Sequence, residues 1–143
     1  MTQGHHEGDL LMRAARTLRR RWAHSLVPWE LSPHQARALR VICSALEGHE
    51  DRPPRLSDVA ESLRIAPRSA TEVIDSLEAK GLVGRSPSPN DRRSIVVTPT
   101  PQGQQVRRAI EQARVEEADD FFAPLDEADR ASLAAILRKA LDE

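Results

Sequence analysis

The sequence of 143 residues contains a single cysteine, Cys43, and no tyrosine. One cysteine can form no internal disulfide and cannot supply the paired ligands of a structural zinc site. The five histidines include no pair spaced i, i+4, the spacing that places two metal ligands on one face of a helix. We therefore expect no disulfide and no metal site.

Sequence motifs of catalysis are also missing. The chain has no Gly-x-Ser-x-Gly, no His-Glu-x-x-His and no glycine-rich phosphate loop, and it contains six glycines in all. Aromatic residues make up 3% of the chain, which leaves few platforms for stacking single-stranded bases. We expect no enzyme, no cofactor and no binding of single-stranded nucleic acid.

Long apolar runs are absent as well. No stretch approaches the ~20 residues that a membrane-spanning helix needs, and residues 1–9 lack the basic start and apolar run of a secretion signal. We therefore expect a cytoplasmic protein that does not enter a membrane. Its length fits one domain of roughly 100–150 residues, and its 39% of hydrophobic residues can form a core.

The charged residues are unevenly distributed along the chain, although the formal net charge is only -1. Residues 52–103 hold eight basic and six acidic residues, a net charge of +2. Residues 104–143 hold six basic and ten acidic residues, a net charge of -4. The middle of the chain is therefore the part that we expect to meet an anion.

The prolines fall between segments of helical periodicity and mark the boundaries of the elements. We expect a mainly α fold with one small β-hairpin, in a single domain with three segments, 1–31, 32–100 and 101–143. Caps, prolines and apolar spacing predict helices over residues 9–26, 33–48, 57–63, 67–80, 101–120 and 126–141, and hairpin strands over 82–83 and 94–98.

Two short predicted helices, joined by a tight turn at residues 64–66, form a helix-turn-helix motif. Ala70, Val73, Ile74 and Leu77 make the apolar stripe of the second helix, so its other side chains must point outward. Either this is the solvated face of a core helix, or its N-terminal end enters a major groove. The outward residues are Arg68, Ser69, Thr71, Glu72, Asp75 and Ser76.

In a major groove, these outward residues would have distinct roles. Arg68 could address guanine, and Ser69 or Thr71 could bind a base or a phosphate oxygen. Glu72 could accept a hydrogen bond from the amino group of cytosine, or it could simply pair with Arg68 at i, i+4. Ser57, at the start of the first helix of the pair, completes the candidate DNA-binding residues of the motif.

The predicted hairpin carries Arg92 and Arg93 at its tip, behind a stretch that is stiffened by prolines. Such a tip is either a solvated turn or a narrow cationic arm that suits the negative potential of a minor groove. In the second case we assign Arg93 to the groove and Arg92 to a phosphate. Asp91 would be costly beside phosphate, so we expect it to orient an arginine through a bidentate pair.

Several segments together resemble the MarR family of winged-helix regulators. The resemblance covers nearly the whole chain, and the Asp-x-Arg of the family's wing matches Asp91 and Arg93. Many relatives carry a basic or amide residue at the position of Glu72 and a serine or threonine cap at that of Ala66, so a base preference does not transfer. The matching segments are Leu31-Ser32-Pro33-His34-Gln35, residues 56–63, residues 70–83, Asp91-Arg92-Arg93 and residues 98–103.

This resemblance implies a homodimer in which the N- and C-terminal helices, segments 1–31 and 101–143, interlock. It also implies that two winged helix-turn-helix regions, segment 32–100 of each subunit, read a pseudo-palindromic DNA duplex, often under the control of a small aromatic effector. Independently, the apolar stripes of the terminal helices exceed what a small winged core can cover, so they either pair with a second subunit or fold back on their own.

We therefore expect a dimeric, sequence-specific DNA-binding transcriptional regulator that acts as a repressor. The alternative is a winged-helix module that binds protein through the same hairpin. A protein-docking surface should show an exposed aromatic or apolar anchor, and the sequence shows none there.

Cys43 lies on the apolar stripe of the second predicted helix, where a thiol is usually inert packing; the alternative is a peroxide-sensing thiol. Trp22 and Trp29 flank the end of the first predicted helix. They either pack in the core or an interface, or line an effector pocket.

Overall fold

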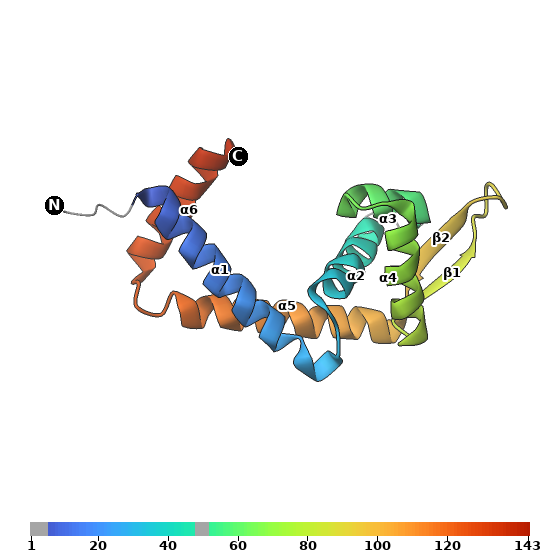
Figure 1. Cartoon of the computed structure of the whole chain (residues 1–143), viewed down its shortest axis with the longest axis horizontal. Coiled ribbons are helices and arrows are strands. Elements are labelled where there is room, and N and C mark those ends of the chain that lie inside the picture. Colours follow the sequence, from blue (N-terminus) through green and yellow to red (C-terminus); the bar gives the residue numbers. More distant parts are fainter. Residues whose placement is uncertain (1–5, 48–51) are drawn as a thin grey trace. The chain divides into compact units, whose positions relative to one another are not determined.

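The computed structural model describes residues 6–47 and 52–143 (Figure 1). It confirms a mainly helical fold with one antiparallel hairpin. Gly48, where we expected the second helix to end, lies outside the described residues. The elements are α1 (Glu7–Ser25), the short 3-10 helix η1 (Val27–Trp29), α2 (Pro33–Leu46), α3 (Leu56–Leu63), α4 (Pro67–Ala79), β1 (Val83–Pro87), β2 (Ile95–Pro99), α5 (Pro101–Phe121) and α6 (Glu127–Leu141).

The chain divides into two compact units, one of which is Ala23–Gln112. Its core lies where α2, α3 and α4 meet the base of the hairpin. Burying a leucine, isoleucine or valine side chain stabilises the fold by about 1.5–3 kcal/mol. The apolar faces of α3 and α4 are therefore held in the core, and their other faces remain accessible to solvent. The largest fully buried side chains are Leu39, Ile42, Ile74, Leu77, Val59 and Val97.

A capping box starts α2 at the expected place. The backbone N–H of Gln35 donates to Ser32 Oγ over 3.2 Å, and the N–H of Ser32 donates to Gln35 Oε1 over 2.8 Å. The same Gln35 side chain donates through Nε2 to Ser76 Oγ on α4, at 2.5 Å. The cap of α2 therefore also joins α2 to α4.

The turn between α3 and α4 consists of residues 64–66. Arg64 adopts a left-handed conformation with φ 54°, and the N–H of Ile65 donates to the carbonyl of Ala60 over 3.1 Å. α3 starts at Leu56, one residue before the expected Ser57, because the N–H of Arg55 is capped by Asp58 Oδ2 at 3.0 Å. This turn closes the helix-turn-helix motif.

Each strand of the hairpin has five residues, paired from Val83 opposite Pro99 to Pro87 opposite Ile95. The first strand is longer than the sequence predicted, because its polar residues are paired with the more apolar β2. Arg55 forms a further bridge to Val96, and the N–H of Val97 donates to the carbonyl of Pro54 over 2.9 Å. The segment before α3 thus lies along the outer edge of β2.

A close backbone contact joins the hairpin base to α5. Thr100 Oγ1 donates to the carbonyl of Gly81 over 2.6 Å and accepts from the N–H of Gly103 over 3.0 Å. A Cβ on Gly103 would lie 2.9 Å from the carbonyl carbon of Leu82 and closer still to its oxygen. Only glycine fits this position without moving the backbone.

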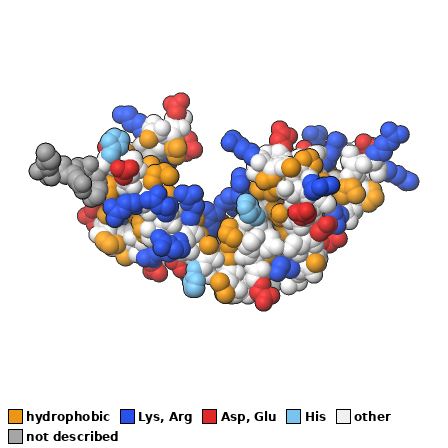
Figure 2. Space-filling model, viewed as in Figure 1, with side chains coloured by type: hydrophobic (Ala, Val, Ile, Leu, Met, Phe, Trp, Pro, Cys, Tyr) orange, Lys and Arg blue, Asp and Glu red, His pale blue; other side chains and the backbone are white. Residues whose placement is uncertain are grey.

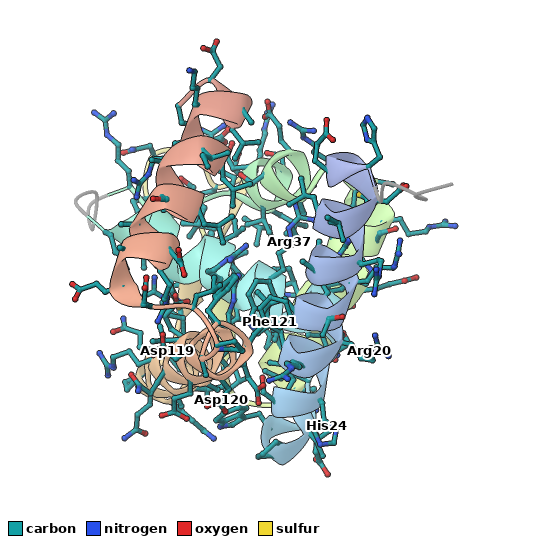
Figure 3. All side chains as sticks on the ribbon, turned by 90° about the vertical axis from the view of Figure 1, so that its left-hand side faces the viewer. Arg20, His24, Arg37, Asp119, Asp120 and Phe121 are labelled. Atoms are coloured by element: carbon teal, nitrogen blue, oxygen red, sulfur yellow. The ribbon has the colours of Figure 1, made fainter. Side chains whose placement is uncertain are left out.

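The second unit contains the chain up to Trp22 together with Ala113–Glu143. Arg114 stacks over the Trp22 ring, with its Cζ 4.5 Å from the ring centroid, and Arg130 pairs with Asp119 at 2.9 Å. Figure 2 shows hydrophobic side chains at the surface of this unit. Figure 3 looks onto it, with Phe121 turned toward α1, where Arg21 lies over its ring. Neither α1 nor α6 contains a buried residue among those described.

Candidate nucleic-acid interface

The first turn of α4 presents Arg68 and Ser69 to solvent, while Ala70 behind them is buried. Ala66 at the N-cap offers no side-chain acceptor, and Pro67 at the first helical position has no N–H. The positive end of the helix dipole is therefore not neutralised by a cap, and it lies beside the cation of Arg68. This end of α4 is suited to an anion such as a phosphate.

Two further candidates lie one turn along α4. Thr71 is half-buried, and its hydroxyl donates to the carbonyl of Pro67 over 3.0 Å, so it can offer only its acceptor capacity and its methyl group. Glu72 is exposed, and no ion pair joins it to Arg68 within residues 52–143. Its carboxylate can accept hydrogen bonds from outside the chain.

The outward face of α4 is narrower than the sequence predicted. Ser76 is half-buried because its hydroxyl accepts the hydrogen bond from Gln35 on α2. Asp75 is exposed, but it forms an ion pair of 2.5 Å with Arg85 of β1. The prediction that both point freely outward is therefore wrong for Ser76, and Asp75 is already paired.

Asp91, Arg92 and Arg93 are all exposed at the tip of the hairpin. The N–H of Arg93 donates to Asp91 Oδ1 over 3.0 Å, and Ser94 Oγ donates to Asp91 Oδ2 over 3.4 Å. The expected bidentate pair between Asp91 and an arginine side chain is therefore wrong. Asp91 instead closes the turn through the backbone, as short polar side chains commonly do in turns.

The guanidinium groups of Arg92 and Arg93 form no ion pair with any described residue. Figure 2 shows basic side chains at the far end of the hairpin, which Figure 1 identifies as β1 and β2. Asp91 holds the backbone of this tip, and both cations remain available to an external anion.

Two other arginines, Arg55 and Arg85, belong to this region and are not among the predicted site residues. Arg85 on β1 contacts two carboxylates of α4. Arg55 lies on a groove between the segment before α3 and the hairpin loop, which Asp58 and Pro89 also line. A signal for Arg85 was present, because Asp75 and Glu78 are spaced i, i+3 on the helix that precedes its strand. Ser57 is exposed in the first turn of α3.

Cys43 is 7% exposed, on the face of α2 that forms the core. Burial raises the pKa of its thiol, and the nearby Arg107 partly opposes this shift. A thiol of raised pKa is a poor nucleophile at neutral pH, which favours the packing role over the sensing role. Within the described part of the chain, no group of three or more His, Cys, Asp or Glu residues could hold a metal ion.

Comparison with known proteins gives consistent matches. The MarR family model matches residues 31–95. A putative transcriptional regulatory protein for the hcr operon of Thauera aromatica is 37% identical over 83 residues, which are 58% of this chain and 50% of that protein. An uncharacterized HTH-type transcriptional regulator of Mycobacterium bovis is 37% identical over 55% of this chain and 52% of its own length. The chain thus spans about half the length of these relatives.

Solved structures resemble nearly the whole chain. The reduced form of MarR from E. coli has a TM-score of 0.81 at 24% identity, over 95% of this chain and 96% of that one. At this identity, the likeness shows the fold. A structure of BpsR from Bordetella bronchiseptica, described with the regulation of its DNA binding by 6-hydroxynicotinic acid, has a TM-score of 0.70 at 26% identity, over 100% of this chain and 98% of that one. None of the described helices is both long and apolar enough to cross a membrane.

Proposed function

We propose that the chain is a dimeric DNA-binding transcriptional repressor of the MarR family, whose model matches residues 31–95, rather than an enzyme. One observation carries the proposal. The hairpin tip holds two exposed arginines without an internal ion pair, and the uncapped, cationic end of α4 belongs to the same compact unit. Two such cationic elements in one compact unit suit a DNA duplex.

In this proposal, α4 reads the major groove. Arg68 binds the acceptor edge of guanine, Ser69 binds a base or a phosphate oxygen, and Thr71 accepts from a base amino group or contacts a base with its methyl group. Glu72 accepts from the amino group of cytosine, since no cation of the described chain pairs with it. Ser57 in the first turn of α3 donates to a phosphate, as hydroxyl side chains commonly do.

The hairpin serves as the wing. Arg93 enters a minor groove, where a narrow width concentrates negative potential, and Arg92 binds a phosphate. Asp91 holds the tip through its hydrogen bonds to the backbone of Arg93 and to Ser94. The carboxylate of Asp91 accepts these hydrogen bonds within the turn.

We also propose that α1, α5 and α6 form the dimer interface. The apolar side chains of these helices remain exposed in one chain, and a second copy would remove them from water. Two subunits would then read a pseudo-palindromic operator. The exposed apolar residues are Leu10, Leu11, Met12, Val115, Ile136 and Leu141, with exposed fractions from 48% to 66%.

A small aromatic effector completes the proposal. The DNA binding of the Bordetella relative is regulated by 6-hydroxynicotinic acid, and that protein is 26% identical over the whole of this chain. We propose that a compound of this class releases the repressor from its operator in the cytoplasm.

The test is binding to duplex fragments that the purified protein selects from genomic DNA. Fluorescence anisotropy over a range of salt concentrations should give a steep loss of affinity, and sedimentation should give the mass of a dimer. Arg93→Ala should weaken binding by about 1–3 kcal/mol and reduce the slope of log K against log salt by about 0.9 for each subunit.

Arg37→Ala is the matched control, because it removes an exposed arginine from α2, outside the proposed DNA-binding residues and the proposed dimer interface. This variant should keep both the affinity and the slope. Equal effects of the two substitutions, or no effect of Arg93→Ala, would contradict the assignment of the wing. Failure to select any duplex would contradict DNA binding itself.

A further inference from the structure

Arg85 on β1 directs all of its described polar contacts at α4. Its Nη2 pairs with Asp75 Oδ1 at 2.5 Å and donates to Glu78 Oε1 over 3.3 Å, and its Nε donates to Glu78 Oε2 over 3.3 Å. Its backbone N–H also donates to Glu78 Oε2, over 3.2 Å. The side chain is 27% exposed, against 54% for Asp75 and 41% for Glu78.

We call these contacts, from Arg85 to Asp75 and Glu78, the tie. They join β1 of the hairpin to α4. The planar guanidinium binds one carboxylate through two nitrogens while it reaches a second carboxylate, which fixes its orientation. The backbone N–H of Arg85 also donates to Glu78, so both the backbone and the side chain of this residue are bound to α4. The hydrogen bond to Glu78 raises the pKa of Arg85 above its already high ordinary value, so the guanidinium is charged at neutral pH.

Packing does little to hold the strand at this point. A Cβ placed on the neighbouring Gly84 would meet no atom within 4 Å, so one side of β1 is open. Only residues 80–82 connect α4 to β1 along the chain. Buried Val83, Val96 and Val97 hold the hairpin against the core, and the ion pairs of Arg85 add polar contacts between β1 and α4 beside this packing.

The tie also changes the charge that α4 would present to a phosphate backbone. Glu72, Asp75 and Glu78 are exposed on this helix, and the single positive charge of Arg85 offsets one of the two negative charges of Asp75 and Glu78. Without Arg85, none of these three carboxylates would have a cationic partner among the described residues. Like charges at that distance oppose binding.

We infer that Arg85 is a positioning residue of the DNA-binding surface, which holds the wing against α4 through Asp75 and Glu78 and does not itself contact DNA. This inference rests on the proposed function. It differs from the role proposed for Arg93, whose guanidinium has no ion pair among the described residues and is assigned to the duplex itself.

The test is a thermodynamic cycle for duplex binding. It compares the wild type, Arg85→Ala, the double variant Asp75→Asn with Glu78→Gln, and the triple variant. Arg85→Ala should weaken binding about tenfold in the wild-type background, within the usual range for coupled contacts, and should have no effect once the two carboxylates are removed. The salt slope should remain that of the wild type, because no phosphate contact is lost.

The conservative variant Arg85→Lys keeps the charge but loses the planar fork, so it should recover only part of the affinity. If Arg85 bound phosphate, Arg85→Lys would bind nearly as the wild type does, and Arg85→Ala would lower the affinity and the slope in both backgrounds. Either result would overturn the inference, as would wild-type affinity in Arg85→Ala.

Amide hydrogen exchange gives a readout that needs no DNA. The amides of residue 85 and its neighbours in β1 should exchange faster in Arg85→Ala than in the wild type, because the guanidinium contacts that hold Glu78 beside the N–H of residue 85 are lost. Unchanged exchange would overturn the inference even where no duplex binds, which separates its failure from that of the proposed function. Thermal unfolding checks each variant, and Arg85→Lys and the carboxylate variants carry the test if Arg85→Ala does not fold.

Discussion

Replacing Gly103 by alanine should destabilise the protein strongly, because Gly103 is where α5 meets the base of the wing. The added methyl group would lie 2.9 Å from the carbonyl carbon of Leu82 and closer still to its oxygen. That atom belongs to the backbone, so no side chain can rotate away, and α5 or the hairpin base must move.

The magnitude follows from what this movement disturbs. Overpacking a tight site costs about 1–3 kcal/mol. The shift also strains two hydrogen bonds, from the N–H of Thr100 to the carbonyl of Leu82 (3.0 Å) and from the N–H of Gly103 to Thr100 Oγ1 (3.0 Å), each worth about 1 kcal/mol. The better helix propensity of alanine returns about 1 kcal/mol. The free energy of unfolding should therefore fall by about 2–4 kcal/mol.

Urea denaturation followed by circular dichroism measures this change, at one fixed protein concentration because a dimer makes stability depend on concentration. Gly84→Ala is the matched control, since a Cβ at Gly84 meets nothing within 4 Å. It should change the free energy of unfolding by less than about 0.5 kcal/mol, as surface substitutions usually do. Equal stability of Gly103→Ala and the wild type would refute the reasoning.

Two further predictions concern α2. Ser32→Ala removes the side-chain acceptor of its capping box and should lower the free energy of unfolding by about 1 kcal/mol; the same urea titration measures it, and Ser62→Ala on the exposed side of α3 should show no comparable loss. Cys43 should react with iodoacetamide far more slowly in the folded protein than in urea, and rapid labelling of the folded protein would contradict its inert role. Because burial raises the pKa of this thiol, the folded state favours its protonated form. The free energy of unfolding should therefore not depend on this thiol's titration below its ordinary pKa of about 8.5, and it should fall as the pH rises above that value.

The helices follow closely from local patterns in the sequence. Pro33 and Pro67 stand at the first positions of α2 and α4, as expected, and Gly81 adopts φ 73° just beyond the end of α4. Such signals act within a few residues, through caps, proline geometry and the left-handed freedom of glycine, and no distant contact is needed to read them. The observed starts of α3 and α6 differ from the expected ones by a single residue.

The details of the candidate interface depended on contacts that the sequence does not contain locally. Ser76 looked free on α4, yet Gln35, 41 positions away, binds its hydroxyl. Asp91 precedes two arginines in the sequence, yet its carboxylate closes a turn. It accepts from the backbone N–H of Arg93, because short polar side chains readily bond to backbone groups close to them along the chain. The 3-10 helix η1 also went unpredicted, since three residues carry no measurable period.

The amino-acid sequence alone determined the type and order of the helices, the apolar face of each one and the cationic tip of the hairpin, because each of these depends on neighbours along the chain. Tertiary structure alone decided which polar side chains remain available. The pairing of Arg85 with Asp75 and Glu78, the bond from Gln35 to Ser76 and the close approach of Gly103 to Leu82 all join separate elements. A hydrogen bond or ion pair needs its partner within about 3 Å, and only the packing of the core brings such partners together.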